Sequence, residues 1–181
     1  LGNFEFEGFD FSGFSRLKIV DLSGSFKPFS LAIGLRSLGL ANSFNLGARQ
    51  LNSISNKSSI KDLNLMFSDV EGLDFSHFEG LETLDLSSAK GLTAAQFNAI
   101  PNKGSVKVLN LNNVDVTGFD FSEFTGLEEL KLNNVKGLTA LPDNIAIFTY
   151  LKKLDIGNVT ELTSLPTGIT NLPKNCEVNI S

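Results

Sequence analysis

Apolar residues recur along the chain in one short motif, apolar-x-x-apolar-x-apolar, whose copies begin 18 to 25 residues apart. Counting its first apolar residue as position 1, the motif starts at Leu17, Leu35, Ile60, Leu81, Val106, Leu127 and Leu151. Positions 4 and 6 are also aliphatic in each copy. Since successive side chains of a strand point to opposite faces, each copy predicts a short strand with one buried face. Strands repeated at this interval are expected to stack in parallel as one curved sheet.

The 21-residue copies share a phenylalanine-rich connection, Gly-Phe/Leu-Asp-Phe-Ser-x-Phe. Its glycine, at positions 8, 72 and 118, is expected to relieve a turn. Its phenylalanines are expected to point inward and to stack from copy to copy. They are Phe11, Phe14, Phe75, Phe78, Phe121 and Phe124. This connection therefore predicts an extended or 3-10 return with an aromatic spine opposite the aliphatic residues.

The longer copies have room for a helix after the strand. The candidate segments are 48–56, 93–100 and 143–150, with Thr93 and Asp143 as N-terminal caps. The convex side should therefore alternate between short helices and extended or 3-10 turns, which makes the fold class an α/β solenoid.

Both ends of the chain carry incomplete copies. Leu1 lies five residues before Phe6, which is the spacing of a position-6 residue in later copies, so we expect an upstream repeat before it. At the other end Asn175 takes position 1, while Val178 and Ile180 keep the inner positions of a worn terminal repeat. We expect residues 1–181 to form a single, monomeric domain of about seven complete repeats plus partial terminal ones.

The motif Leu127-x-x-Leu130-x-Leu132 and its copies resemble the leucine-rich repeat family. Segments 138–142 (LTALP) and 162–166 (LTSLP) are similar to the LxxLP-type repeats of bacterial proteins. This resemblance implies a protein–protein interaction module, the recognition part of a secreted bacterial effector-like protein acting in a host cell. Two alternatives remain open: the substrate-recognition arm of a bacterial ubiquitin ligase whose catalytic domain lies elsewhere, or an extracellular adhesin or receptor ectodomain.

Position 9 departs from the family, which usually places there an Asn that bonds the backbone of the turn. The residues here are Ser25, Ser43, Ser68, Ala89, Val114, Val135 and Val159. Serine replaces such bonds in part, whereas Ala and Val have no polar group, so we expect water or main chain to satisfy the turn carbonyls. The preceding position is often Asn, at 42, 113, 134 and 158, and a shifted asparagine ladder is the alternative.

Charge and composition narrow the class of partner to a protein or peptide. The net charge of -5 and pI near 4.9 disfavour nucleic acid and anionic membrane, which attract clustered Lys and Arg. No run approaches the roughly 18 apolar residues of a membrane span. The single cysteine, Cys176, forms no internal disulfide.

Residues able to carry chemistry are few, so we expect neither an enzyme nor a bound cofactor or metal. The sole histidine, His77, falls on an exposed turn. Cys176 falls in the last strand without a histidine near it in sequence. Asp10, Asp74 and Asp120 recur with the turn motif and are expected to bond turn amides. A calcium site is the alternative for these three, although residues one repeat apart lie too far apart for one ion.

The candidate binding surface is the concave face of the sheet, made by positions 3, 5 and 7. We select from it, together with the neighbouring Phe67, the following set: Asp21, Asn64, Met66, Phe67, Asp85, Ser87, Asn110, Asn112, Lys131, Asn133 and Asp155. With no Trp and one Tyr in the chain, Met66 and Phe67 are the best apolar anchors. Position 2 carries alternating charges that predict a surface ladder: Lys61, Glu82, Lys107, Glu128 and Lys152.

Overall fold

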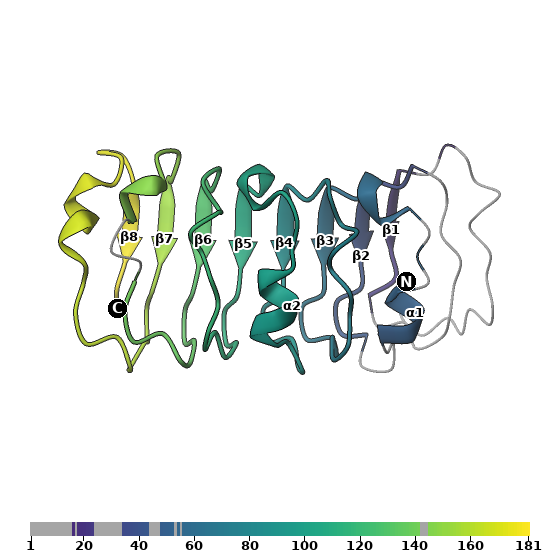
Figure 1. The fold of residues 1–181 in the computed structure, drawn as a ribbon, viewed down its shortest axis with the longest axis horizontal. Coiled ribbons are helices and arrows are strands. Elements are labelled where there is room, and N and C mark those ends of the chain that lie inside the picture. The colour runs from purple at the N-terminus through teal and green to yellow at the C-terminus, as the bar shows by residue number, and fades with distance from the viewer. Residues whose placement is uncertain are drawn as a thin grey trace.

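The computed structural model describes residues 16, 18–23, 34–43, 48–52, 54, 56–141 and 145–181. In this part of the chain, eight parallel three-residue strands form one sheet in chain order, side by side along the long axis (Figure 1). They are β1 (Ile19–Asp21), β2 (Ser37–Gly39), β3 (Asp62–Asn64), β4 (Thr83–Asp85), β5 (Val108–Asn110), β6 (Glu129–Lys131), β7 (Lys153–Asp155) and β8 (Glu177–Asn179). Leu84, Leu109 and Leu130 are register partners, which confirms the predicted parallel stack.

The core lies directly beneath this sheet. The predicted inner residues of β1 to β7 are all buried, and each is 8% exposed or less. They are Val20, Leu22, Leu38, Leu40, Leu63, Leu65, Leu84, Leu86, Leu109, Leu111, Leu130, Leu132, Leu154 and Ile156. A single strand of three residues buries too little surface to persist alone, so stacking of neighbouring copies holds each one in place.

The return side carries short helices and 3-10 turns, as predicted. The α-helices are α1 (Ala48–Asn52) and α2 (Ala94–Asn98), and the 3-10 turns are η1 (Lys57–Ser59), η2 (Lys103–Ser105), η3 (Ile145–Ile147) and η4 (Thr167–Asn171). Thr93 is the N-cap of α2, as expected. In place of the helix expected over 143–150, the described residues form only η3. Ile145, Phe148 and Leu151 are buried in and after η3. They are three positions apart, which fits the three residues per turn of a 3-10 helix.

Phenylalanines fill the space between the sheet and the return side. Phe75, Phe78, Phe121 and Phe124 are buried, which confirms that they point inward. Their ring contacts with one another lie within single copies, Phe75 with Phe78 and Phe121 with Phe124. Phe97 of α2 joins them, and its ring centroid lies 4.2 Å from that of Phe119, 5.4 Å from Phe121 and 5.3 Å from Phe124. The long and short copies are therefore packed together through aromatic rings.

Predictions at the ends have mixed outcomes. β8 pairs with β7 where the terminal repeat was expected, but Val178 and Ile180 are 39% and 63% exposed. Their inner positions therefore lack the cover that the other strands have. The predicted upstream repeat at Leu1 lies outside the described residues, as do the following predicted residues: Gly8, Asp10, Phe11, Phe14, Ser25 and Asp143.

Candidate interaction surface

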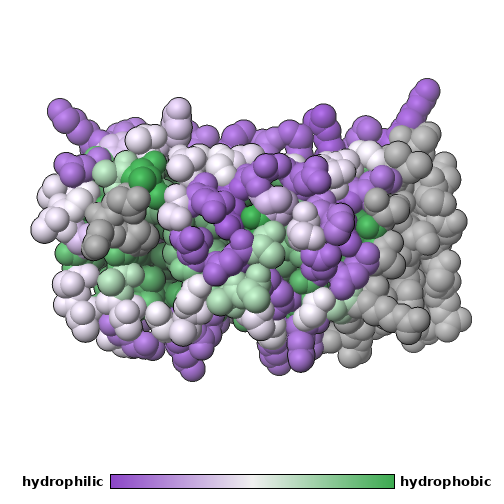
Figure 2. All heavy atoms as spheres, viewed as in Figure 1, coloured by the Kyte–Doolittle hydropathy of each residue, from purple (hydrophilic) through white to green (hydrophobic). Residues whose placement is uncertain are grey.

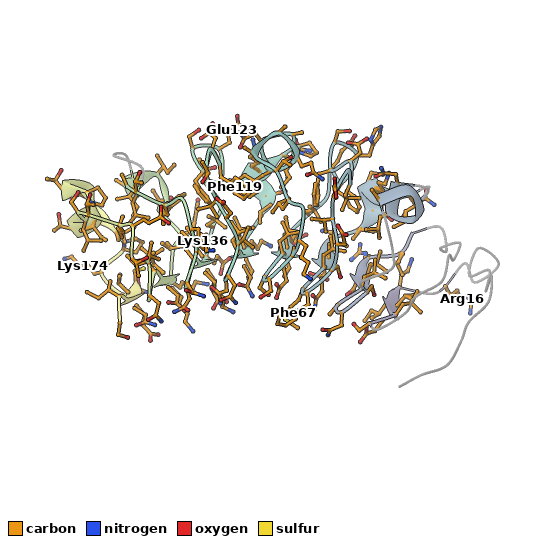
Figure 3. All side chains as sticks on the ribbon, turned by 90° about the horizontal axis from the view of Figure 1, so that it is seen from below. Arg16, Phe67, Phe119, Glu123, Lys136 and Lys174 are labelled. Carbon is orange, nitrogen blue, oxygen red and sulfur yellow. The ribbon has the colours of Figure 1, made fainter. Side chains whose placement is uncertain are left out.

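We define the sheet face as positions 3, 5 and 7 of the strands β1 to β8. The row of strands follows a shallow arc, with Phe67 on the strand side and Phe119 and Glu123 on the opposite, return side (Figure 3). Figure 2 shows that return side, where hydrophilic side chains cover the central copies and hydrophobic surface gathers toward the C-terminal ones. The register aligns Asn64, Asp85, Asn110, Lys131 and Asp155 as successive partners, so the predicted middle column exists.

The polar residues of this column hold the strand ends. In Asp21, Asn64, Asp85, Asn110 and Asp155, the side-chain Oδ1 accepts a hydrogen bond from the amide two residues later, which is an Asx turn. The donors are Ser23, Met66, Ser87, Asn112 and Gly157, at 3.0, 3.0, 2.9, 3.2 and 3.1 Å. Ordinary turn chemistry therefore accounts for much of the column.

Several of these side chains are fixed further by their neighbours. Asn110 Nδ2 donates to Asp85 Oδ2 at 3.0 Å across adjacent strands. The buried Ser87 donates its hydroxyl to Asp85 Oδ1 at 2.6 Å. Lys131 cannot accept a hydrogen bond, and in its copy the amide of Asn133 donates instead to Asn112 Oδ1 at 2.8 Å. These bonds orient the side chains of Asp85, Ser87, Asn110 and Asn112.

The charges of the sheet face divide between its two halves. Toward the C-terminus, Glu129 lies 3.2 Å from Lys131 Nζ and 3.7 Å from Lys153 Nζ, so the charges there offset one another. Over β3 and β4, Asp62 is exposed and Asp85 is half-buried. Within the described residues, neither of these two carboxylates has an ion-pair partner. The half over β3 and β4 is therefore acidic.

Met66 and Phe67 form an apolar patch beside β3, separate from Ile19 on β1, which is 69% exposed. Met66 is half-buried, whereas Phe67 is 43% exposed. Phe67 occupies position 8, and its backbone is left-handed, with φ of 57°. Every described position-8 residue has a positive φ: Asn42, Phe67, Ser88, Asn113, Asn134 and Asn158. Asparagine tolerates this conformation well, whereas a bulky residue is strained in it.

Position 9 follows the sequence interpretation in some copies, whereas the buried Ser43 Oγ has no hydrogen-bond partner among the described residues. Ser68 Oγ, which is buried, donates to the Leu40 carbonyl at 2.7 Å and so links two copies. Main chain closes the turn at Ala89 and Val114, as in Val114 N to Leu111 O at 3.1 Å, and also at Ser68. Asn134 Nδ2 donates to Asn113 Oδ1 at 2.8 Å, so part of a shifted ladder is present as well.

The position-2 charge ladder is confirmed in two pieces. Glu82 pairs with Lys61 on one side and with Lys107 at 2.8 Å on the other, and Glu128 pairs with Lys152. Hydrogen bonds from the Lys107 and Lys61 ammonium groups lower the pKa of Glu82 from 4.5 to about 2. These pairs lie along the edge where the strands begin and leave the middle of the sheet face open.

Ser76, His77 and Asp74 lie together on an exposed turn but do not form a catalytic relay. Ser76 Oγ, at 2.9 Å, and Asp74 Oδ2, at 3.3 Å, both face the same ring nitrogen, His77 Nδ1. Among the described residues, no hydrogen bond involves the other nitrogen, Nε2. Asp74 and Asp120 accept the amides two residues later, as predicted for turn residues. Desolvation raises the pKa of the Cys176 thiol, which disfavours the reactive thiolate. No group of three or more potential metal ligands occurs among the described residues.

A second set of polar residues, on the return side, was not identified from the sequence. Asn98, the last residue of α2, donates its Nδ2 to the Gly118 carbonyl at 3.1 Å and accepts the Asp120 amide on its Oδ1 at 2.9 Å. Asn52 makes the same two bonds 46 residues earlier, at 3.0 and 2.8 Å. The 46-residue spacing of these asparagines was the sequence signal for this clamp.

Two buried lysines complete the clamp. Lys103 is 4% exposed, and its Nζ donates to the Asn98 carbonyl at 2.9 Å and lies 3.6 Å from Glu123. Lys57 caps α1 in the same way at 2.8 Å and lies 5.9 Å from the centre of the Phe78 ring. Each ammonium thereby satisfies a carbonyl at a helix C-terminus, where positive charge is favourable.

Comparison with solved structures shows a likeness to a leucine-rich repeat domain. The leucine-rich repeat domain of the type III effector XopL superposes on 94% of this chain with a TM-score of 0.55 and 18% sequence identity. The chain has the leucine-rich repeat fold. It spans 55% of the length of that solved chain. No family model and no curated protein matches the sequence. Proteins with the leucine-rich repeat fold bind partners through extended surfaces. Among the described residues, no helix is long and apolar enough to cross a membrane.

Proposed function

We propose that this leucine-rich repeat chain is a protein-interaction module that binds a protein or peptide on its sheet face. The observation that carries the proposal is the pre-ordered column of Asx turns, which fixes side chains along the sheet face before any partner arrives. A surface that is already ordered loses little conformational entropy on binding, so more of the contact energy appears as affinity. At the centre of the face, for example, Asn110 donates a hydrogen bond to Asp85, which orients both side chains.

The likeness to an effector domain supports a finer proposal. We infer that the chain is the recognition part of a secreted bacterial effector-like protein, and that any chemistry done to its target belongs to another domain or protein. Support comes from the LxxLP-type segments 138–142 and 162–166, together with the type III effector whose repeat domain has this fold.

Photo-cross-linking tests which face binds. A photoreactive benzoyl-phenylalanine replaces Thr83 in the centre of the sheet face, or Ala95 on the exposed side of α2, and the protein is irradiated in a host-cell lysate. We expect a discrete adduct from position 83 and none from position 95. An adduct from position 95 alone would show that the return side is the binding surface.

A blocking variant provides the second arm. Thr83→Arg and Val108→Arg place long side chains on the sheet face without removing an Asx acceptor, whereas Ala95→Arg places the same side chain on α2. With the cross-linker at position 83, Val108→Arg is expected to abolish the adduct and Ala95→Arg to preserve it; with the same cross-linker moved to position 108, Thr83→Arg is expected to abolish the adduct. Circular dichroism and thermal unfolding of all variants establish that they are folded.

A further inference from the structure

Building on the proposed function, we propose that the sheet face over β3 and β4 takes an extended segment of a partner protein, in which a basic side chain stands two to four residues from an apolar one. Asp62 and Asp85 would receive the cation, and Met66 and Phe67 the apolar group. The inference deepens the proposed function by naming the chemistry of the segment that binds.

The two carboxylates form an acidic pair open to a partner. Asp85 accepts hydrogen bonds from the Ser87 amide and hydroxyl on Oδ1 and from Asn110 Nδ2 on Oδ2. These donors are neutral, so they orient the carboxylate without cancelling its charge. Asp62 is exposed on the neighbouring strand. Because Asn64 is the register partner of Asp85, Asp62 lies diagonally opposite, roughly 7–8 Å away at the backbone.

The apolar pair is the second, independent observation. Phe67 takes a left-handed backbone conformation that disfavours phenylalanine, and its ring is 43% exposed. Neither backbone geometry nor core packing therefore explains an aromatic residue at this position. Among the described copies the other position-8 residues are all Asn or Ser. A contact made outside the chain explains the choice, since a strained and exposed residue is a frequent mark of a binding site.

Spacing along the strand sets the length of the segment. The rise of about 3.3 Å per residue places Met66 roughly 7 Å beyond the Asn64–Asp85 row and roughly 13 Å beyond Asp62. An extended peptide covers these distances with two to four residues. Charge complementarity also acts at longer range, because a chain of net charge -5 attracts a basic segment and speeds encounter.

A peptide-display experiment tests the inference. A library of random 12-residue peptides is selected on the wild-type chain, and the enriched sequences are synthesised and titrated. We expect Lys or Arg two to four residues from an aromatic or aliphatic residue. Phe67→Asn and the pair Asp62→Asn with Asp85→Asn should each weaken binding by about tenfold or more, as loss of a central contact does.

Each variant has a matched control in the same backbone setting. Ser88→Asn is the control for Phe67→Asn, because both place asparagine at a left-handed position 8. Asp115→Asn is the control for the charge variant, because Asp115 Oδ1 accepts the Thr117 amide and hydroxyl at 3.0 and 2.6 Å, much as Asp85 accepts those of Ser87. Both controls should bind the peptides like the wild type.

The outcomes separate this inference from the proposed function. Enriched peptides that lack the basic–apolar pattern, or no enrichment at all, would overturn the inference. The inference would also be overturned if Phe67→Asn and the double variant of Asp62 and Asp85 bound the peptides as well as the wild type while Thr83→Arg abolished binding. In that case the sheet face would still be the binding surface. Peptides indifferent to Thr83→Arg as well would overturn both.

Discussion

At the scale of single residues, position 8 shows backbone geometry selecting an amino acid. Asn113 has φ of 61°, and its side chain bonds Ser88 Oγ at 3.1 Å and Asn134 at 2.8 Å. We predict that Asn113→Ala lowers the free energy of unfolding by roughly 1–2 kcal/mol, because alanine is strained in this conformation. Asn113→Gly removes the same hydrogen bonds without that strain, so it should cost clearly less. Urea unfolding measures both, and equal losses would attribute the effect to the hydrogen bonds.

Among the carboxylates with a lowered pKa, Glu82 has the largest shift and is therefore the residue that best tests the pH dependence of stability. The folded-state pKa of Glu82, about 2, is below its ordinary 4.5, so the folded chain binds its proton less readily than the unfolded chain. The contribution of Glu82 is therefore complete above about pH 5 and disappears as the pH falls toward 2. We predict that the difference in Tm between wild type and Glu82→Gln is largest near neutral pH and shrinks across this window. A difference that stays constant with pH would contradict the assignment.

At the scale of the element, the cap of α2 reverses an ordinary expectation. Gln96 Oε1 accepts the Thr93 amide and hydroxyl, while its Nε2 donates to the Val70 and Leu73 carbonyls at 2.7 and 3.0 Å. Glutamate usually stabilises this helix position. Here its carboxylate would face two carbonyl oxygens, so we predict that Gln96→Glu destabilises by roughly 1–3 kcal/mol. Gln96→Ala serves as the control and should be the milder change, as thermal unfolding at pH 7 can show.

The elements also show how far the sequence alone leads. The strands and the aromatic spine were predictable because their apolar residues recur at fixed positions along the chain. Leu84, at position 4, is buried as this periodicity predicts. The prediction of an α-helix over 143–150 was wrong because apolar residues three positions apart suit a 3-10 turn as well as an α-helix. The role of Asp85 and Asn110 was missed in part, since an Asx bond depends on where the strand turns, which hydropathy does not report.

At the scale of the whole molecule, the unit of construction is a long copy followed by a short one. Asn98 clamps the turn of the next copy, Lys103 lies between α2 and Glu123 of that copy, and Phe97 stacks on Phe119. Contacts of this kind make stability a sum of copies and their interfaces. Asn98 and Lys103 join the long copy to the short copy that follows it, while Gln96 Nε2 bonds the Val70 and Leu73 carbonyls of the copy before it.

The ring contacts of Phe97 predict where damage spreads when that ring is removed. Phe97→Ala removes a buried ring and should cost about 3–5 kcal/mol. Its contacts are with Phe119, Phe121 and Phe124, so hydrogen exchange should accelerate mainly over 116–127, toward the C-terminus. Phe78→Ala is the reciprocal control, because the contacts of that ring with Phe75 and Lys57 lie on the other side, and it should expose 57–78. Uniform acceleration in both variants would mean that the sheet unfolds as one unit rather than in pairs of copies.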